Sequence, residues 1–239
     1  MKKKILSLCL VLALGATAVI GGTLAYFTDT DTETNTFTAG NIAIELEEVF
    51  PNNELMPGTA TRNALQKEVY VKNTGDNPAY MWAEILIPAK LDSLGNAALN
   101  DLHFNYYDTY QDAEGNLYPC SSKAAEAKGM TGPVYVIEEI YMETVVIDGN
   151  EYNVYLHYTK NDTAKNSGEK TAALLAQVYM DKDITQCTDD GHEDCLVLKD
   201  GDHYTDSWEL IVNAYGIQAQ GFDTIKDAIN AYYDKTVIN

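Results

Sequence analysis

The sequence predicts an all-β protein, a jelly-roll-like antiparallel β-sandwich with a short internal helix and a C-terminal helix. Three observations lead to this fold class. Several segments place apolar residues at every second position, an Asp-Gly pair separates two strand-like segments, and there are 17 tyrosines, which form strands readily. Roughly eight strands can be counted, which fits a sandwich or jelly roll better than a closed barrel.

Each strand is predicted from its own pattern. Phe37–Glu48 alternates apolar and small or polar residues, as a strand with one buried face does. Asp148-Gly149 supplies the turn that a tight hairpin requires. A short loop joins the segments on either side of residues 74–78, and we expect these two to form a second hairpin. The remaining predicted strands are Lys67–Asn73, Ala79–Ile87, Val134–Ile147, Glu151–Thr159, Thr171–Met180 and Trp208–Gln218.

Two helices are expected beside the strands. Residues 89–130 form a long polar excursion with a helix near Ser122–Lys128, and Gly129 ends it. The C-terminal helix is predicted to begin with Asp223 as its N-cap. Its apolar stripe of Ile225, Ile229 and Tyr232 has helical spacing and is expected to enter the core.

The N-terminus has the pattern of a secretory leader. Three lysines precede an apolar run from Ile5 to Ile20, and small residues at Thr23 and Ala25 predict cleavage before Tyr26. The run is interrupted and falls short of the ~20 apolar residues that span a bilayer, so we expect no stable membrane span after processing. The predicted organisation is a signal peptide at 1–25, a β-prone segment at 26–41 and one domain at 42–239.

The chain is strongly acidic. Its formal net charge is −20, and loss of the three leader lysines makes it −23. Such a surface repels nucleic acid and anionic lipid, so we expect neither as a partner. The acids are spread along the chain, which favours a solvated outer face over an acidic interaction segment.

Several stretches resemble a known family. Gly21-Gly22-Thr23-Leu24-Ala25-Tyr26-Phe27-Thr28-Asp29 is similar to the processing site of substrates of the SipW-type signal peptidase, among them the TasA and camelysin family. The resemblance continues in residues 35–44, Leu55-Met56-Pro57-Gly58 and residues 70–76, and resumes at Ala214-Tyr215-Gly216-Ile217. It implies secretion by a Gram-positive bacterium, a jelly-roll-like sandwich, processing by a SipW-type peptidase, and a role in biofilm fibres.

The cysteines suggest one disulfide. Cys9 leaves with the leader, and an odd number remains, Cys120, Cys187 and Cys195. We favour a disulfide between Cys187 and Cys195 in an exported chain, with Cys120 free. The alternative is a Zn²⁺ site formed by Cys187, His192, Cys195 and His203. The acids of the same loop could bind Ca²⁺, but the ligand spacing of a calcium loop is absent.

No catalytic arrangement is evident in the sequence. The camelysin name carries a metallopeptidase label, but no pair of histidines has the helical spacing of a zinc peptidase. His157 lies in a tyrosine-rich strand and is expected at the surface. Adjacent carboxylates such as Glu138 and Glu139 point to opposite faces of a strand and cannot act as one acid-base pair. We therefore predict a non-enzymatic protein without a cofactor.

The N-terminal segment suggests how such a protein could assemble. An extended peptide can add to the sheet edge of a neighbouring molecule through backbone hydrogen bonds, and Tyr26, Phe27 and Phe37 are the expected anchors. The alternative is that this segment pairs within its own domain. We predict a secreted structural subunit that self-associates into fibres, as the resemblance implies. The other readings are a secreted metallopeptidase and a monomeric surface binding module that uses exposed Tyr, Trp82 or Trp208.

Overall fold

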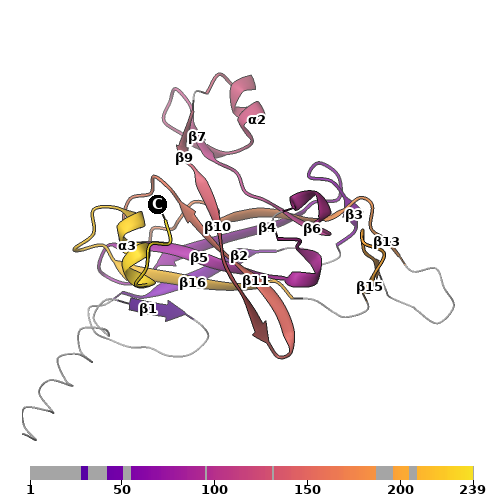
Figure 1. The fold of residues 1–239 in the computed structure, drawn as a ribbon. Helices are drawn as coiled ribbons and strands as arrows, with labels where there is room; N and C mark the ends of the chain where they lie inside the picture. The colour runs from indigo at the N-terminus through magenta and orange to yellow at the C-terminus, as the bar shows by residue number, and fades with distance from the viewer. Residues whose placement is uncertain are drawn as a thin grey trace, which may run out of the picture.

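The computed structural model describes residues 28–31, 42–50, 55–94, 96–130, 132–186, 196–204 and 209–238. They form two main sheets that share one hydrophobic core, and two small three-stranded sheets (Figure 1). The predicted all-β sandwich is confirmed. The described part contains sixteen strands rather than about eight, because many of them span only two to four residues.

The first main sheet, sheet A, is antiparallel throughout and has the strand order β1-β16-β5-β11-β10. Its strands are β1 (Thr28–Asp31), β5 (Ala79–Pro88), β10 (Ile137–Ile147), β11 (Asn150–Thr159) and β16 (Ile211–Gln218). The β10–β11 hairpin turns at Asp148 and Gly149, whose φ angles of 49° and 86° explain why this pair occupies the turn. The predicted hairpin is confirmed.

The second main sheet, sheet B, has the order β2-β4-β12-β3, and β6 also pairs with β12. Its strands are β2 (Ile44–Val49), β3 (Pro57–Gly58), β4 (Leu65–Asn73), β6 (Leu102–Asn105) and β12 (Leu175–Asp181). The strand predicted at Thr171–Met180 starts only at Leu175. Before it, the backbone N–H groups of Thr171 and Leu174 bond to β4 as part of a loop.

The expected hairpin between β4 and β5 is wrong. The two strands lie in different sheets, and residues 74–78 carry the chain from one to the other. Each strand already has neighbours on both sides, β2 and β12 for β4, and β16 and β11 for β5. The buried Asn73 side chain holds this crossover, because its Nδ2 donates to the carbonyl oxygens of Asn77 and Lys165, each at 2.8 Å.

Strand β5 is buried on both faces. Met81, Ala83 and Ile85 point into the core shared with sheet B, whereas Tyr80 and Trp82 belong to a second apolar cluster with the C-terminal helix. This helix, α3 (Ile225–Tyr232), covers the outer face of sheet A (Figure 1). Its Ile225 and Ile229 are fully buried, as predicted.

The N-cap of α3 is Thr224, not Asp223. The Thr224 Oγ1 accepts a hydrogen bond from the Asp227 N–H at 3.2 Å, with an extended backbone at the cap. Asp223 lies one residue too early, and its carbonyl oxygen accepts a hydrogen bond from the Tyr80 hydroxyl instead.

A carboxylate ties α3 to sheet A. Glu84 of β5 accepts hydrogen bonds from the hydroxyls of Tyr215 in β16 at 2.7 Å and Tyr233 at 2.6 Å. Trp82 Nε1 also donates to the Tyr233 hydroxyl. Burial, reinforced by the nearby Glu84, raises the pKa of both tyrosines well above the usual value.

The excursion at 89–130 contains two short 3-10 helices, Ala89–Leu91 and Ala97–Leu99, strand β6 and two strands of a small sheet that stands away from the sandwich (Figure 1). That sheet comprises β7 (Thr109–Gln111), β8 (Leu117–Pro119) and β9 (Pro133–Tyr135). The predicted internal helix is present as α2 (Ser122–Ala127), capped by Ser121, and Gly129 follows it with φ 72°. Cys120 is free, as expected.

Sheets A and B approach closely at Gly216. A Cβ atom at this position would lie 2.8 Å from Cγ2 of Ile44 in β2. Glycine is therefore required here by the packing of the two sheets rather than by a turn.

We expect Gly216→Ala to destabilise the protein by about 1–3 kcal/mol, because the added methyl overpacks the core between β2 and β16. Denaturant unfolding of the single variant, of Ile44→Ala and of the double variant measures the effect. The double variant should be more stable than the sum of the two single effects predicts, because Ile44→Ala removes the clashing atom. Strict additivity would contradict this account.

We expect stability to fall as the pH rises above about 10, because the unfolded chain ionises its tyrosines there while Tyr215 and Tyr233 keep their protons in the folded state. Each such tyrosine contributes up to about 1.4 kcal/mol per pH unit. In chemical denaturation between pH 9 and 11, Tyr233→Phe should flatten the decline. Tyr141→Phe, on the exposed hairpin, is the control, and equal slopes in the two variants would refute the assignment.

Candidate functional site at the β16 edge

The strongest candidate for a functional site is the edge of sheet A at β16. Strand β1 covers this edge with the antiparallel register Thr28↔Ile217 to Asp31↔Ala214. It has four residues, against eight in β16, so it caps only the C-terminal half of that strand. On its other side β16 pairs along its full length with β5.

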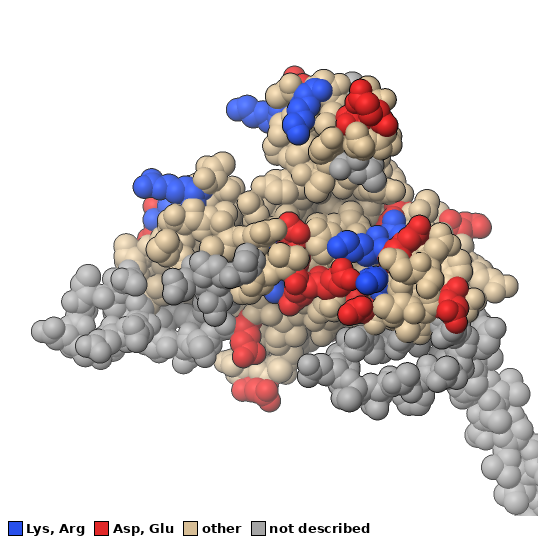
Figure 2. Space-filling model, turned by 180° about the vertical axis from the view of Figure 1, so that it is seen from behind, with Lys and Arg blue, Asp and Glu red and all other residues tan. Residues whose placement is uncertain are grey.

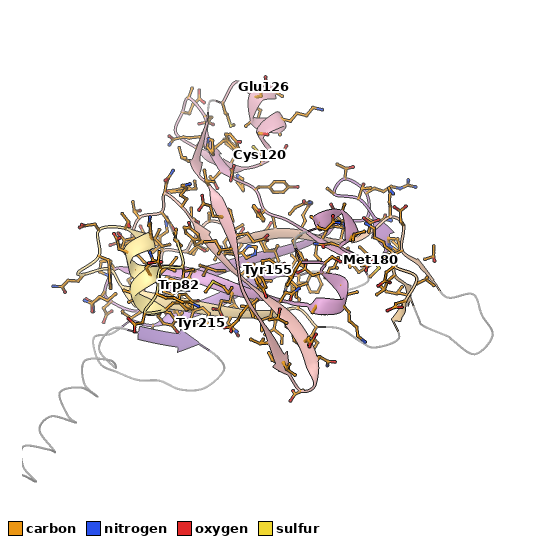
Figure 3. The ribbon with its side chains drawn as sticks, viewed as in Figure 1. Trp82, Cys120, Glu126, Tyr155, Met180 and Tyr215 are labelled. Atoms are coloured by element: carbon orange, nitrogen blue, oxygen red, sulfur yellow. The ribbon has the colours of Figure 1, made fainter. Side chains whose placement is uncertain are left out.

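The covered strand is held firmly by side chains. Tyr215 stacks on Trp82 with ring centroids 6.0 Å apart, and Tyr232 contacts both rings edge to face. Figure 3 places Trp82 and Tyr215 beside α3, next to β1. The aromatic contacts and the Glu84 hydrogen bond fix β16 from its outer face through residues that do not belong to β1.

Three stretches that carry the family resemblance meet beside this edge. Ile44 of β2 packs on Gly216 of β16. The N–H groups of Thr74 and Gly75 donate to the carbonyl oxygen of Ala43 at 2.8 and 3.0 Å. Residues widely separated in the sequence thus build one corner of the sandwich, directly after the segment that leads from β1 to β2.

Most of the site residues predicted from the sequence lie outside the residues that the structure describes. Outside the described residues lie the cleavage residues Thr23, Ala25 and Tyr26, the anchors Phe27 and Phe37, the cluster Cys187, His192 and Cys195, and also Trp208. His203 lies in β15 (His203–Tyr204), which pairs with β14 (Leu196–Val197). β14 in turn pairs with β13 (Thr185–Gln186).

The residues that flank the cysteine segment are cross-strand neighbours. Gln186 of β13 pairs with Leu196 of β14 in an antiparallel register. A Cys187–Cys195 bridge would continue from this pair, so the disulfide preferred from the sequence stays a prediction that the register favours.

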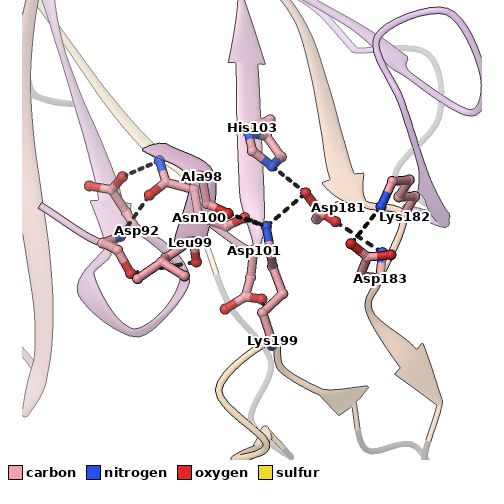
Figure 4. Close-up of polar contacts among 11 residues, drawn as sticks. Asp92, Ala98, Leu99, Asn100, Asp101, His103, Asp181, Lys182, Asp183 and Lys199 are labelled. Atoms are coloured by element: carbon pink, nitrogen blue, oxygen red, sulfur yellow. Dashed lines mark hydrogen bonds and ion pairs between the residues drawn. The ribbon is translucent and has the colours of Figure 1, made fainter. Parts of the chain in front are cut away.

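The described histidines do not converge on a metal site. His103 Nε2 lies 2.9 Å from Asp181 Oδ2, and the Lys199 ammonium approaches the same oxygen at 3.0 Å (Figure 4). Burial opposes ionisation of Asp181, but hydrogen bonds from the Asp183 N–H, Lys199 and His103 outweigh it and lower its pKa to about 2. This ion-pair network was not apparent from the sequence, because its members lie far apart along the chain.

The predicted surface position of His157 is wrong. The side chain is 1% exposed, and its Nδ1 lies 3.0 Å from the Leu174 carbonyl oxygen. Strand β11 lies inside sheet A, and Tyr106 packs edge-on against the imidazole and covers it. Trp82 is also fully buried, so it cannot serve a surface binding module.

The residues that the structure describes do not form the zinc site of a metallopeptidase. Within the described ranges, no group of three or more His, Cys, Asp and Glu side chains is placed to hold a metal ion. The adjacent acids Glu138 and Glu139 serve different neighbours, as predicted: Glu138 accepts from Tyr158 and Lys160, and Glu139 approaches His157.

Comparison with known protein families gives one match, over the N-terminal part of the chain. The family model described as camelysin metallo-endopeptidase matches residues 1–78. This matched part contains no histidine, since the four histidines all lie further along the chain. No curated protein and no solved structure gives a significant match.

No helix in the described part of the chain is both long and apolar enough to cross a bilayer. The resemblance inferred from the sequence is confirmed for the N-terminal third of the chain, where residues 1–78 are similar to the camelysin family.

Proposed function

We propose that this protein is a secreted, non-enzymatic structural subunit of the extracellular matrix or cell surface, and that it assembles by exchange of its N-terminal strand. The observation that carries the proposal is the pairing of β1 with the β16 edge. The backbone hydrogen bonds of β1 would be equally satisfied on the β16 of a second molecule.

The position of β1 favours exchange. Besides its neighbour strand β16, β1 contacts β2, whereas β16 is fixed by β5 and the aromatic cluster. A short strand at the end of the chain can leave without disturbing the shared core. Addition of β1 to the next molecule forms a heterologous interface, which propagates into a fibre rather than closing into a dimer.

The opposite edge of sheet A is protected against the same kind of pairing. Strand β10 carries Glu138, Glu139 and Glu143 and has a register shift between Tyr141 and Glu143. Charges and bulges on an edge strand discourage further strand addition. Growth would therefore be directed to the β16 edge.

The charge pattern is compatible with self-association. On the face shown in Figure 2, acidic and basic side chains are intermingled rather than gathered into separate patches. Glu47 of β2, for example, contacts Lys72 at 3.0 Å and Lys170 at 3.2 Å. The overall excess of acids still predicts slower assembly at low ionic strength, where repulsion between subunits is least screened.

Export belongs to the same proposal. The leader at 1–25, cleavage at Ala25 by a SipW-type signal peptidase and an extracellular location are supported by the leader pattern and by the family match. Cleavage would free the terminus that precedes β1. We propose no catalytic role, and a purified protein without stoichiometric zinc would agree with that proposal.

Purified residues 26–239 should form fibres, and a version that begins at Asn41 should stay monomeric, because it lacks β1. Negative-stain electron microscopy and size-exclusion chromatography measure both. Monomers from the longer version at high concentration and over a range of pH would overturn the fibre assignment.

A pair of variants tests the backbone pairing itself. Prolines at Thr28 and Thr30 remove two N–H donors from β1 and should abolish fibres. Valines at the same positions keep the donors and should assemble normally. Loss of fibres in both variants would point to the threonine side chains rather than to strand pairing.

Non-reducing mass spectrometry of proteolytic peptides should find Cys187 linked to Cys195, while Cys120 reacts with an alkylating reagent. Full alkylation of all three thiols in the exported protein would contradict the predicted disulfide.

A further inference from the structure

A cavity of about 520 Å³ lies on the inner face of sheet A, away from the β16 edge. Its walls come from β5, β6, β10, β11 and the loop that carries the two short 3-10 helices. Tyr155, labelled in Figure 3, lies in its wall where the β10–β11 hairpin crosses the sandwich. This volume is within the range of roughly 300–1,000 Å³ typical of small-molecule sites.

One wall holds a buried carboxylate that only neutral groups solvate. Asp92 is 5% exposed, and its Oδ2 accepts hydrogen bonds from Asn153 Nδ2 at 2.8 Å and the Tyr155 hydroxyl at 2.5 Å. Its Oδ1 accepts from Asn100 Nδ2 at 2.8 Å. The hydrogen-bond donors that reach the Asp92 carboxyl group are thus the side-chain amides of Asn100 and Asn153 and the hydroxyl of Tyr155.

A second carboxylate faces the cavity from β10. Glu139 Oε2 lies 3.2 Å from His157 Nε2. The other ring nitrogen of His157 points at the Leu174 carbonyl oxygen and so carries a proton, while Nε2 makes no hydrogen bond to any described group. The buried imidazole thus lies directly behind Glu139, which approaches its Nε2 without forming a hydrogen bond.

The lining of the cavity offers carboxyl groups but no strongly basic side chain. No lysine or arginine is among its lining residues. His103 lines it, and its Nε2 lies 2.9 Å from Asp181 Oδ2. The Lys199 ammonium, which donates to a carbonyl oxygen of the 97–100 loop, lies 3.0 Å from the same Asp181 oxygen. Asp92 and Glu139 are the two carboxyl groups of the lining itself.

Aromatic rings line the rest of the cavity: those of Phe104, Tyr106, Tyr141 and Tyr155. Tyr141 and Tyr155 meet edge to face with centroids 5.7 Å apart, and Tyr141 is 43% exposed at the entrance. Aromatic faces next to carboxylates are the surroundings that an alkylammonium group prefers, because the rings and the negative charge attract the same cation.

We propose that this cavity binds an organic ammonium cation on a slender carbon chain, either the side chain of a lysine in a peptide or a free amine. A hard metal ion is a poorer occupant, because the described acids there do not form a metal-ligating group. The site is separate from the β16 edge, so it does not depend on strand exchange.

The test is isothermal titration calorimetry on residues 26–239. The probes are Nα-acetyl-lysine methylamide and n-butylamine, with the uncharged Nα-acetyl-norleucine methylamide as the matched neutral ligand. We expect at least one charged probe to bind and the neutral one not to bind. Binding of the lysine derivative alone would indicate a peptide side chain, and binding of butylamine alone would indicate a free amine.

Two variants assign the binding to this cavity. Glu139→Gln should weaken the charged probe by about tenfold or more, the scale expected for loss of a charged hydrogen-bond partner. Glu143→Gln, on the same strand but outside the lining, should change affinity less than about twofold. Tyr141→Leu, at an exposed position that the fold tolerates, should also weaken binding.

Three results would overturn the proposal: no heat from either charged probe at millimolar concentration, equal binding of the neutral probe, or equal losses in Glu139→Gln and Glu143→Gln. Circular dichroism of each variant confirms that the fold is intact, so that a loss of binding can be read as a loss of the site. Fibre formation by the same preparations reports separately on the proposed assembly.

Discussion

The structure depends on β5 being buried on both faces. One face completes the core between the two sheets and the other is covered by α3, so a single strand joins three layers. Glu84 is the one residue of β5 that is not buried, and its carboxylate accepts hydrogen bonds from two tyrosine hydroxyls. A buried strand with one polar residue needs polar partners at that point, and Tyr215 and Tyr233 provide them. The position of α3 and the rigidity of β16 both follow from this requirement.

The same constraint explains what the sequence could and could not predict. Short-range signals were reliable: the Asp148-Gly149 turn, the helix ended at Gly129 and the apolar stripe of α3 depend on neighbouring residues alone. Predictions of pairing between strands that are distant in the sequence were not reliable. The segments on either side of residues 74–78 look like a hairpin, and only the occupied edges of both strands show why they separate into two sheets.

The candidate sites likewise contain parts that the sequence predicts and parts that only the fold brings together. A strand-forming N-terminus could be predicted from its composition, but its partner β16 lies at the other end of the chain. The buried His157 was misplaced because alternation cannot distinguish an edge strand from an inner one. The cavity lined by Asp92, Glu139 and Tyr155 had no sequence signal at all, since these residues are far apart in the chain and become neighbours only in the fold.

The strand order has a consequence for how the molecule forms. Sheet A joins residue 28 to residue 217 and residue 79 to residue 218, so one of its inner strands comes from near the end of the chain. Such non-local closure slows folding, because a long loop must be ordered before its contacts are gained. A chain that emerges with its N-terminus first would have β1 available well before β16. During that interval β1 lacks its partner strand within its own molecule, so the edge that β1 covers is among the last parts of sheet A to close.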